Sequence, residues 1–566
     1  MQRALDLLEH TNRSLFLTGK AGSGKSTFLR YVCQTTHKKH VVLAPTGIAA
    51  INAGGVTLHS FFKIPFHPLV PNDVKYSPRH IKETLKYNSE KRKIIQELEL
   101  IIIDEISMVR ADIIDFVDKV LRVYSRNMRV PFGGKQLLLV GDIFQLEPVV
   151  KEEDRQLLTP FYPSAYFFDA LVFRRFELVS IELKKVYRQS DASFVRILDD
   201  IRTNQVTDRE LATLNSRVGA DLTQEDNHLA ITLSARRDTV DYINEQHLNL
   251  LPGDAVRLIG EITGEFPTQN LPTSIELDIK PGAQIIFVRN DKDHRWVNGT
   301  LGIISGIGMN EEGEEQLYIV TEDGEELDVD RERWSNMRYT FNSKEQKIEE
   351  EEIGTFTQFP IRLAWAITVH KSQGLTFRHV NIDFSGGVVA GGQTYVALSR
   401  CTSLEGISLK APIRRGDIFI RHEVIRFAST YNNHQVYQRA FSESKADREY
   451  RDAVEAFDAG DMQSFLDHFF IAIHQRYDIE NPVIKRYIRK KLDIINRLRR
   501  EKEALTAEYK KKERYLKKLS AEYVLMGKEC ERENMKEAAI ANYKKALELH
   551  PGSREAKRRI QELNGH

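Results

Sequence analysis

Short aliphatic runs alternate with helix-length segments in the N-terminal third of this chain. The runs lie at residues 15–17, 41–43, 100–103 and 137–140. Runs of β-favouring residues separated by helical stretches indicate βαβ units around a buried parallel sheet. The same pattern resumes near residues 231–233 and 380–383. We therefore predict two α/β domains.

Residues 256–355 follow a different pattern and predict a small β-barrel inserted into the second α/β domain. Short apolar runs are separated there by turn signals such as Asn298-Gly299 and Asp323-Gly324. The strands are expected at 285–288, 302–304, 317–320 and 326–329, and one polar turn carries Arg289, Lys292, His294, Arg295 and Trp296.

From about residue 424 the chain becomes helical and poor in glycine, with a long charged stretch over 483–520. The segment 520–551 has the residue spacing of one tetratricopeptide unit. A lone repeat cannot bury both of its faces, so it must pack on neighbouring helices or on a partner. The residues that match are Gly527, Ala539, Tyr543, Ala546 and Pro551.

Composition is that of a soluble globular protein, with 41% hydrophobic and 29% charged residues among 566. No apolar run approaches the about 18–20 residues of a membrane span, and the start lacks a secretory signal. The three cysteines, Cys33, Cys401 and Cys530, are far apart and have no metal-ligand spacing. We therefore expect a cytoplasmic protein with no membrane partner.

Positive charge is unevenly distributed, although 82 Lys and Arg nearly balance 81 Asp and Glu. Residues 485–566 carry 24 Lys and Arg against 13 Asp and Glu, a net charge of +11. This region is open to three interpretations: a grip on nucleic acid, a module that docks a protein partner, or a solvated spacer. Glutamates interleaved with the lysines favour docking or spacer over a DNA grip.

A phosphate-binding motif follows the first aliphatic run. The sequence Gly19-Lys20-Ala21-Gly22-Ser23-Gly24-Lys25-Ser26 matches G-x-x-x-x-G-K-[ST] between a strand and a helix. Its glycines let backbone N–H groups approach phosphates, Lys25 reaches the β- and γ-phosphates, and Ser26 ligates Mg²⁺. Asp104-Glu105 follow the run at 100–103, where Asp104 can hold Mg²⁺ and Glu105 can polarise water. The two motifs predict a nucleoside triphosphatase.

Further motifs appear in a fixed order along the chain. They are Ala44-Pro45-Thr46-Gly47-Ile48-Ala49-Ala50, Thr57-Leu58-His59-Ser60-Phe61-Phe62, Gly141-Asp142-Ile143-Phe144-Gln145, Val186-Tyr187-Arg188-Gln189, His370-Lys371-Ser372-Gln373-Gly374 and Tyr395-Val396-Ala397-Leu398-Ser399-Arg400. This ordered set resembles the PIF-type (petite integration frequency) DNA helicases of superfamily 1B, which are RecD-like, and a bacterial member is expected. The resemblance spans residues ~13–410.

The resemblance implies two RecA-like P-loop domains with ATP in the cleft between them. It also implies a wedge insertion and an SH3-like accessory barrel. The implied segments are 1–55 and 97–180 for domain 1, 56–96 for the wedge, 181–255 and 356–425 for domain 2, 256–355 for the barrel, and 426–566 for an all-α region with the tetratricopeptide-like unit at 520–551.

Site residues are carried over from the matching motifs. The resemblance implies catalytic roles for Lys25, Asp104, Glu105, Gln145, Arg188 and Arg400. It implies nucleotide contacts for Gln2, Gly19, Gly22, Gly24, Lys25, Ser26, Thr27 and Gly374, and Mg²⁺ ligation by Ser26 and Asp104. It places Pro45, Thr46, His59, Ser60, Phe61, Thr368, His370 and Lys371 on the DNA track. Core packing is the alternative for Phe61 and Phe62, and turn capping for His59. In the accessory barrel, the resemblance makes Arg289, Lys292, His294, Arg295 and Trp296 candidate contacts to DNA, with a solvated hairpin as the alternative.

The expected function is that of a monomeric ATP-dependent DNA helicase moving 5′-to-3′ on single strands in genome maintenance at the bacterial nucleoid. Its cofactors are ATP and Mg²⁺, and its partners are single-stranded and tailed duplex DNA, with a protein partner for the C-terminal helices. The rival is a P-loop ATPase switch whose helical tail docks a partner without unwinding. The switch predicts ATPase activity indifferent to DNA, whereas the helicase predicts stimulation.

Overall fold

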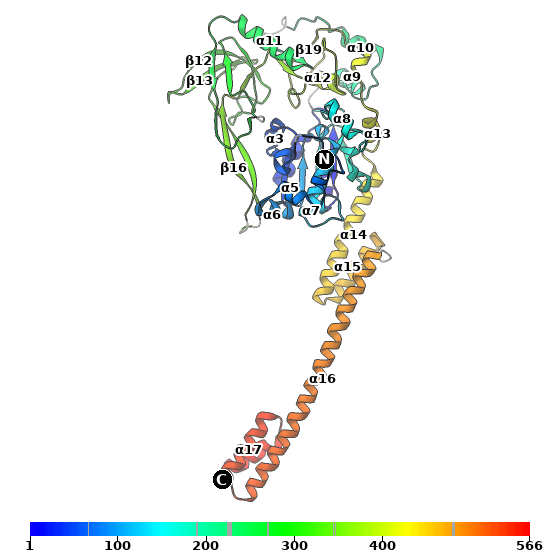
Figure 1. Ribbon diagram of the computed structural model, residues 1–566, viewed down its shortest axis with the longest axis vertical. Coiled ribbons are helices and arrows are strands. Elements are labelled where there is room, and N and C mark those ends of the chain that lie inside the picture. Colours follow the sequence, from blue (N-terminus) through cyan, green and yellow to red (C-terminus); the bar gives the residue numbers. More distant parts are fainter. Residues whose placement is uncertain are drawn as a thin grey trace. The chain divides into compact units, whose positions relative to one another are not determined.

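The computed structural model describes residues 1–65, 67–187, 191–222, 229–268, 271–342, 345, 347–477 and 482–565. Contacts divide the chain into two units, Met1–Lys445 and Ala446–His566. The first unit holds all the β-sheets, and the second is helical (Figure 1).

Domain 1 is built on a six-stranded sheet in the order β3-β2-β4-β5-β1-β6, and its paired strands are parallel. Four of its strands confirm the predicted aliphatic runs. The central strands are buried along their whole length, as expected for a sheet covered on both faces. The strands are β1 (Leu15–Gly19), β2 (His40–Ala44), β3 (Val56–Thr57), β4 (Leu100–Ile103), β5 (Gln136–Val140) and β6 (Val179–Leu183).

Alternating side chains of these strands enter two different cores. Phe16 and Ile101 belong to the core on one face, whereas Leu15 and Ile102 belong to the core on the other. This alternation is why continuous apolar runs, rather than polar–apolar alternation, mark the strands in the sequence. The helices of the domain are α1 (Gln2–His10), α2 (Lys25–Thr35), α3 (Gly47–Ala53), α4 (Leu58–Phe62), α5 (Ile81–Leu85), α6 (Ser89–Glu97), α7 (Ala111–Tyr124) and α8 (Glu152–Leu158).

The segment 56–96, expected as a wedge, packs closely on domain 1. Apolar side chains along it are buried in the same core as Phe16. Tyr87 is also anchored there, since its hydroxyl donates a hydrogen bond to the Phe62 carbonyl oxygen at 2.5 Å. The buried side chains are Leu58, Phe61, Phe62, Ile64, Leu69, Tyr76, Ile81, Leu85, Tyr87, Ile94 and Ile95.

Domain 2 contains a four-stranded parallel sheet in the order β18-β7-β19-β20. Strands β7 and β19 confirm the predicted runs at 231–233 and 380–383. The two α/β domains expected from the sequence are therefore both present. The elements are β7 (Ala230–Ser234), β18 (Ala366–Thr368), β19 (His379–Asp383), β20 (Ile407–Leu409), α9 (Ala192–Arg202), α10 (Asp208–Asn215), α11 (Arg237–Leu250) and α12 (Gln393–Leu398).

The insertion between α11 and β18 is built of β-strands and their connections in its described residues. A five-stranded antiparallel sheet runs β14-β13-β12-β11-β17, and smaller sheets pair β10 with β8 and β15 with β16 and β9. The insertion continues to residue 363 rather than ending at 355, because β17 pairs with β11. The strands are β8 (Val256–Ile259), β9 (Glu261–Gly264), β10 (Glu276–Ile279), β11 (Gln284–Phe287), β12 (Leu301–Met309), β13 (Glu315–Thr321), β14 (Glu326–Val329), β15 (Glu332–Asn342), β16 (Lys347–Gln358) and β17 (Ile361–Leu363).

A long hairpin made by β15 and β16 reaches from the insertion to domain 1, where it runs beside α6 (Figure 1). Tyr339 and Phe341 of β15 are buried in the domain 1 core. The Tyr339 hydroxyl accepts a hydrogen bond from the Val42 N–H at 3.1 Å. Strand β3 pairs only with Leu43 and Ala44 of β2. The hairpin therefore covers part of the β2 backbone that β3 leaves open.

The expected start of the C-terminal region, residue 426, is too early. Phe427 and Tyr431 pack against the domain 1 core on one face of the sheet, and Ala440 is buried in the core on the other. These contacts hold α13 (His422–Ala428) and the first part of α14 (His434–Ala459) on the first unit. The boundary between units lies after Lys445.

The second unit ends in a small three-helix core. Its buried side chains are Val524, Ala539, Tyr543, Ala546 and Ala556. A Cβ at residue 527 would lie 2.5 Å from the Tyr543 ring, so only glycine fits there. The helices of this unit are α15 (Met462–Gln475), α16 (Pro482–Arg532), α17 (Lys536–Leu549) and α18 (Arg554–Asn564).

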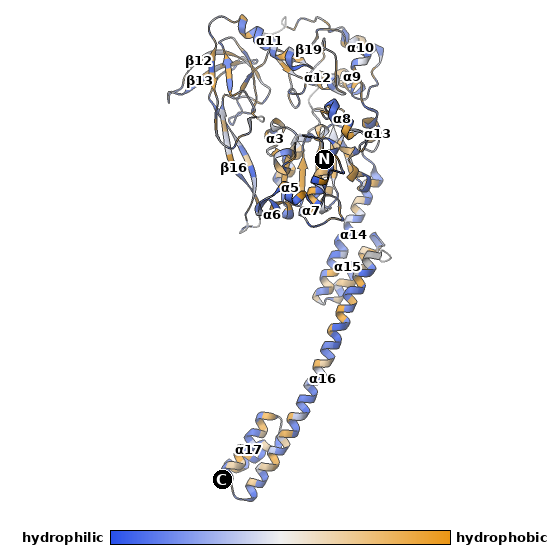
Figure 2. Cartoon of the chain, in the orientation of Figure 1, coloured by the Kyte–Doolittle hydropathy of each residue, from blue (hydrophilic) through white to orange (hydrophobic). Residues whose placement is uncertain are grey.

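Residues 492–515 of α16 are all exposed. Hydrophilic and hydrophobic residues are mixed along this helix (Figure 2). None of the helices in the described part of the chain is both long enough and apolar enough to cross a membrane.

Candidate nucleotide and nucleic-acid site

The P-loop lies between β1 and α2, as the motif predicts. Gly24 precedes the helix with φ of 89°, and Gly22 has φ of 74°, both in the left-handed region that glycine adopts without strain. A Cβ at residue 19 would lie 2.7 Å from the Leu183 carbonyl oxygen. Glycine at these three positions therefore lets the loop turn tightly against the end of β6.

Lys25, the first residue of α2, is held inside the loop. Its Nζ donates to the carbonyl oxygens of Gly19 at 2.7 Å and Lys20 at 3.1 Å. Burial lowers the pKa of Lys25, and the carboxylates of Asp142, Glu105 and Asp104 oppose that effect. The ammonium group is thus surrounded by acidic groups at the carboxyl ends of the central strands.

Asp104 and Glu105 follow β4 directly. The Glu105 N–H donates to Asp104 Oδ1 at 2.9 Å, and Glu105 has φ of 48°, an uncommon value for a residue other than glycine. Burial, with help from the neighbouring Asp104 charge, raises the pKa of Glu105 to about 7. A carboxyl group with that pKa can accept a proton at neutral pH.

Ser26 and Asp104 provide the oxygen donors that Mg²⁺ prefers. The Ser26 residue is exposed at the first turn of α2. Burial raises the pKa of Asp104, which means that its negative charge is costly there without a cation. The donor set and this electrostatic imbalance both fit a divalent cation bound with nucleotide phosphates.

Gln145 contacts domain 2. It is buried, and its Oε1 accepts a hydrogen bond from Gln373 Nε2 at 3.4 Å. Gln373 belongs to the predicted His370–Gly374 segment, and Gly374 at the end of that segment is exposed with φ of 80°. Two motifs that are 228 residues apart in the sequence therefore meet across the cleft.

Arg400 lies just after α12 and is 1% exposed. Its guanidinium donates to the carbonyl oxygens of Val396, Ser372 and Leu375. Its positive charge also helps to lower the pKa of Glu105, against the larger opposing effect of burial. The structure thus brings Arg400 into electrostatic range of the acidic pair. Arg188, the other predicted arginine, lies outside the described residues.

Three further residues of domain 2 reach the P-loop side of the cleft. The Tyr395 hydroxyl accepts a hydrogen bond from the Ala21 N–H at 3.2 Å. Asp199 on α9 forms an ion pair with Lys20. Arg202, at the end of the same helix, pairs with Asp142 at 3.1 Å. Tyr395 belongs to a motif already evident in the sequence, whereas Asp199 and Arg202 belong to an ordinary amphipathic helix and carry no local signature.

Gln2, one of the expected nucleotide contacts, is on α1. An ideal Cβ on Gly24 would lie 2.9 Å from Met1 Cε, so the start of α1 touches the loop. The Gln2 side chain itself donates to Asp6 Oδ1 at 2.8 Å. The amide is therefore bonded within its own helix, and contact of Gln2 with the nucleotide stays a prediction.

A cavity of about 730 Å³ separates the two domains and the β insertion. Domain 1 contributes Ile48 and Asn52 of α3, and domain 2 contributes Lys371 and Gln373. Among the predicted track residues, Thr46 caps α3 by accepting the Ala49 N–H at 3.3 Å. Thr46 on α3 and Lys371, two of the predicted grip residues, therefore belong to segments of the two domains that border one cavity.

Thr368 and His370 lie at the domain 2 end of this predicted track. Thr368 Oγ1 accepts the Lys371 N–H at 3.3 Å and so shapes the turn that carries Lys371. His370 is half-buried, and burial lowers its pKa, which favours the neutral imidazole. Pro45 precedes α3 on the domain 1 side and is partly exposed.

Phe61 does not offer a free ring face to a base. It is 3% exposed, its ring centroid lies 6.0 Å from that of Tyr339, and Lys91 Nζ lies 3.1 Å from its ring centroid. The stacking prediction is corrected to the core-packing alternative, because the β15–β16 hairpin and Lys91 occupy the space around the ring. In the same segment Ser60 is exposed, and burial lowers the pKa of His59.

Arg362 on β17 is a cation that the motif search missed. It lines the cavity together with Lys371. Its Nη2 donates to the Leu271 carbonyl oxygen at 3.2 Å, but no ion pair or Nε partner is found for it among the described residues. Burial lowers the pKa of Arg362 to about 10. The sequence feature that could have pointed to Arg362 is the presence of a charged residue within the apolar run Ile361-Arg362-Leu363-Ala364.

The candidate contacts in the β insertion are already paired. Arg295 binds Asp291 at 2.9 Å, and Arg289 and Lys292 approach Glu332 at 3.5 and 3.8 Å. Trp296 is buried, with its ring stacked on Phe287. Local carboxylates neutralise these cations, so the structure favours the solvated-hairpin alternative and assigns Trp296 to the barrel core.

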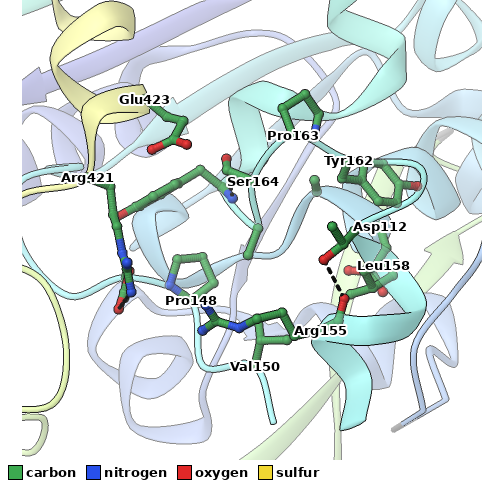
Figure 3. Close-up of a pocket in the computed structure, with 15 residues that line it drawn as sticks. Asp112, Pro148, Val150, Arg155, Leu158, Tyr162, Pro163, Ser164, Arg421 and Glu423 are labelled. Atoms are coloured by element: carbon green, nitrogen blue, oxygen red, sulfur yellow. Dashed lines mark hydrogen bonds and ion pairs between the residues drawn. The ribbon is translucent and has the colours of Figure 1, made fainter. Parts of the chain in front are cut away.

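A separate cavity of about 180 Å³ lies between α8, the loop that follows it, and the residues at the start of α13 (Figure 3). At its edge Glu147 accepts from Arg421 Nε at 3.0 Å and from the Gly391 N–H at 3.3 Å. Glu147 therefore ties domain 1 to domain 2, and the cavity is distinct from the nucleotide cleft.

Two α/β sheets, with a P-loop and acidic pair on one and a buried arginine brought to them by the other, define a two-domain P-loop nucleoside triphosphatase. Residues 4–210 match the PIF1-like helicase family. The Pif1 DNA helicase of Bdellovibrio bacteriovorus is 31% identical over 412 residues, which cover 72% of this chain and 86% of the relative. The chain belongs to the PIF1-like helicases, which confirms the resemblance.

Solved structures and longer relatives agree. Bacteroides sp. Pif1 in complex with ADP-AlF4 is 39% identical, with a TM-score of 0.69, over 76% of this chain and 95% of that one. The human ATP-dependent DNA helicase PIF1 is 33% identical over 406 residues, 70% of this chain. The chain spans 58% of the human relative's length, so the two proteins differ outside the shared motor region.

Proposed function

We propose that this protein is an ATP-dependent DNA helicase that moves 5′-to-3′ along single strands and unwinds duplex or structured DNA in genome maintenance. The observation that carries the proposal is the position of Gln373. It hydrogen-bonds Gln145 beside the P-loop side of the cleft and also lines the cavity of about 730 Å³ with Lys371. A change at the nucleotide can therefore be transmitted directly to residues of the proposed DNA track.

In the proposed cycle, the P-loop N–H groups and Lys25 bind the phosphates of ATP. Ser26 and Asp104 hold Mg²⁺, which neutralises phosphate charge when bound. Glu105 orients and deprotonates the attacking water, since its pKa of about 7 suits a base at neutral pH. Arg400 stabilises the charge that develops on the transferred phosphoryl group.

The cleft is the moving part of the proposed motor. Closure brings Arg400 of domain 2 toward phosphates held by domain 1, so hydrolysis depends on closure. The relative movement of the domains advances one DNA grip toward the other. Thr46 and Ser60 on domain 1, Lys371 on domain 2 and Arg362 on β17 of the insertion suit such a grip, because hydroxyl and cationic groups can contact phosphates without reading bases.

The decisive experiment combines ATP hydrolysis and unwinding by the full chain. Single-stranded DNA should raise the ATPase rate strongly, and a 5′-tailed duplex should be unwound in preference to a 3′-tailed duplex. Unwinding of only the 3′-tailed substrate would overturn the polarity. A measured ATPase with no response to DNA would instead favour a P-loop switch that acts through its helical tail.

The finer assignments belong to the same proposal. The five-stranded antiparallel sheet of the insertion supports an SH3-like accessory barrel, and the packing of Gly527 on Tyr543 supports a tetratricopeptide-like unit at 520–551. The exposed α16 suits docking of a protein partner. A monomeric motor at the bacterial nucleoid completes the proposal, and light scattering of the full chain with and without DNA tests its oligomeric state.

A further inference from the structure

Arg202 is a buried cation that links the two domains. It ends α9, whose apolar residues Phe194 and Ile197 lie in the domain 2 core. Its guanidinium nevertheless pairs with two carboxylates of domain 1, Asp142 at 3.1 Å and Glu182 at 3.2 Å. The side chains of Arg202 and Asp142 are 5% and 0% exposed, so water screens their interaction very little.

The environment of Arg202 is built to keep it charged. Burial alone disfavours the guanidinium charge, but Asp142 and Glu182 hold the pKa of Arg202 above its ordinary value. The Phe144 ring lies 4.2 Å from the guanidinium carbon and adds a cation–π contact. Removing one member of such a buried pair leaves an uncompensated charge, which costs more than the pair itself contributes.

Asp142 faces a second cation. Burial lowers the pKa of Lys25 in the P-loop, and the carboxylate of Asp142 opposes that effect together with those of Glu105 and Asp104. Arg202 is also close enough to oppose the Lys25 charge. One carboxylate of domain 1 is therefore shared between the phosphate-binding lysine of domain 1 and an arginine of domain 2.

The ion pair between Arg202 and Asp142 does not use all of its hydrogen-bonding atoms. Arg202 and Asp142 make one contact at 3.1 Å rather than a two-pronged one, and Arg202 Nε and Asp142 Oδ2 lack hydrogen-bond partners within the described part of the chain. A guanidinium and a carboxylate interact most strongly when two parallel hydrogen bonds form. A second hydrogen bond between Arg202 and Asp142 can therefore still form.

We propose that Arg202 is a positioning residue that couples phosphate binding at Lys25 to closure of the cleft, with Asp142 as the shared link. When Lys25 binds the anionic phosphates, the electrostatic attraction between Lys25 and Asp142 becomes weaker. The Asp142 carboxylate then interacts more strongly with Arg202. The stronger ion pair draws α9, and domain 2 with it, toward domain 1. By reciprocity, a closed cleft strengthens phosphate binding by the same factor.

The inference rests on the proposed ATP-driven motor, and steady-state ATP hydrolysis with saturating single-stranded DNA tests it in the full chain. For Arg202→Gln we expect kcat to fall about 10–100-fold with the KM for ATP changed less than about 3-fold, because coupling rather than phosphate contact is lost. Arg202→Lys should restore about a tenth or more of the wild-type kcat, because lysine keeps the positive charge but cannot form two parallel hydrogen bonds with a carboxylate.

The matched control is Arg196→Gln on the same helix. Arg196 is 79% exposed and lies 3.8 Å from both Asp200 and Glu210, so its loss should leave kcat within about 2-fold. Asp142→Asn should resemble Arg202→Gln, and the double variant should be no worse than either single one, because the two residues act as one unit. Thermal unfolding of each variant identifies any that fail to fold, in which case Arg202→Lys decides.

Wild-type kcat in Arg202→Gln, or in Arg202→Lys where Arg202→Gln does not fold, overturns the inference. So does an additive loss in the double variant. A wild-type protein without DNA-stimulated hydrolysis overturns the proposed function instead, and the two failures are thereby distinguished.

Discussion

The two units of this protein treat polar residues in opposite ways. In Met1–Lys445, buried charged side chains contact each other across the cleft, as Arg202 at the end of α9 and Asp142 after β5 do. In the second unit, residues 492–515 of α16 carry many charges, and all of these residues are exposed. Loss of one member of a buried ion pair is costly, because the remaining charge is left uncompensated. An exposed ion pair contributes little to stability, so its residues can be replaced.

The net charge follows the same division. Residues 485–566 carry +11, and the rest of the chain carries 58 Lys and Arg against 68 Asp and Glu, a net of −10. The overall +1 is an average of these parts. In the proposed motor, a mildly acidic region would bind DNA through hydroxyls, backbone amides and a few placed cations, so the proposed activity depends on the position of charges rather than on total charge.

Lys25→Ala is the most severe test of the motor unit. Loss of the ammonium group that contacts the β- and γ-phosphates should lower DNA-stimulated ATP hydrolysis by about 10³-fold or more and abolish unwinding. Binding to single-stranded DNA should persist, because the cavity residues are unchanged. A gel-based unwinding assay with a 5′-tailed duplex measures the effect, and unwinding by this variant contradicts the assigned site.

Glu105→Gln should separate binding from chemistry. The amide keeps the shape of the side chain but cannot take a proton, so kcat should fall by about 10²–10³-fold while ATP still binds. Fluorescent-nucleotide titration and phosphate release measure the two quantities. If kcat is retained, another group acts as the base.

The pH profile of the wild type probes the same carboxyl group. Because burial and Asp104 raise the pKa of Glu105 to about 7, the reactive deprotonated form disappears as pH falls through that value. We expect kcat to level off above about pH 8 and to fall about tenfold per pH unit below 7. A rate independent of pH between 5.5 and 8 contradicts this role.

Arg362→Gln tests whether the unpaired cation of the cavity binds a phosphate. We expect the affinity for single-stranded DNA to fall about 5–10-fold and the slope of log affinity against log salt to decrease by about 1. The matched control is Arg257→Gln on β8, since Arg257 is 57% exposed and paired with Asp278 at 2.7 Å. Equal salt slopes for wild type and Arg362→Gln exclude the contact.

Removal of residues 446–566 should have the smallest effect on the motor. The truncation leaves the part of α14 that contains Ala440 packed on domain 1. We expect DNA-stimulated ATP hydrolysis within about 2-fold of wild type and an unchanged salt slope of DNA binding. A clearly shallower slope would instead assign the basic tail to DNA.

Local sequence patterns were sufficient for the strands and for the phosphate site. The apolar runs at 15–17 and 100–103 are strands because a sheet covered on both faces needs apolar residues at every position. The P-loop is equally local, since one turn between a strand and a helix makes all of its contacts. These features depend on neighbouring residues, so the sequence by itself determined them and the family.

Tertiary structure alone decided the contacts between distant segments. Arg202 meets Asp142 across 60 residues, and Phe61 loses its free face to a hairpin whose Tyr339 is far away in the chain. Arg202 pairs with two carboxylates, whereas no ion pair of Arg362 is found among the described residues. Such outcomes depend on which side chains the folded chain brings together and shields from water, and no local pattern encodes that proximity.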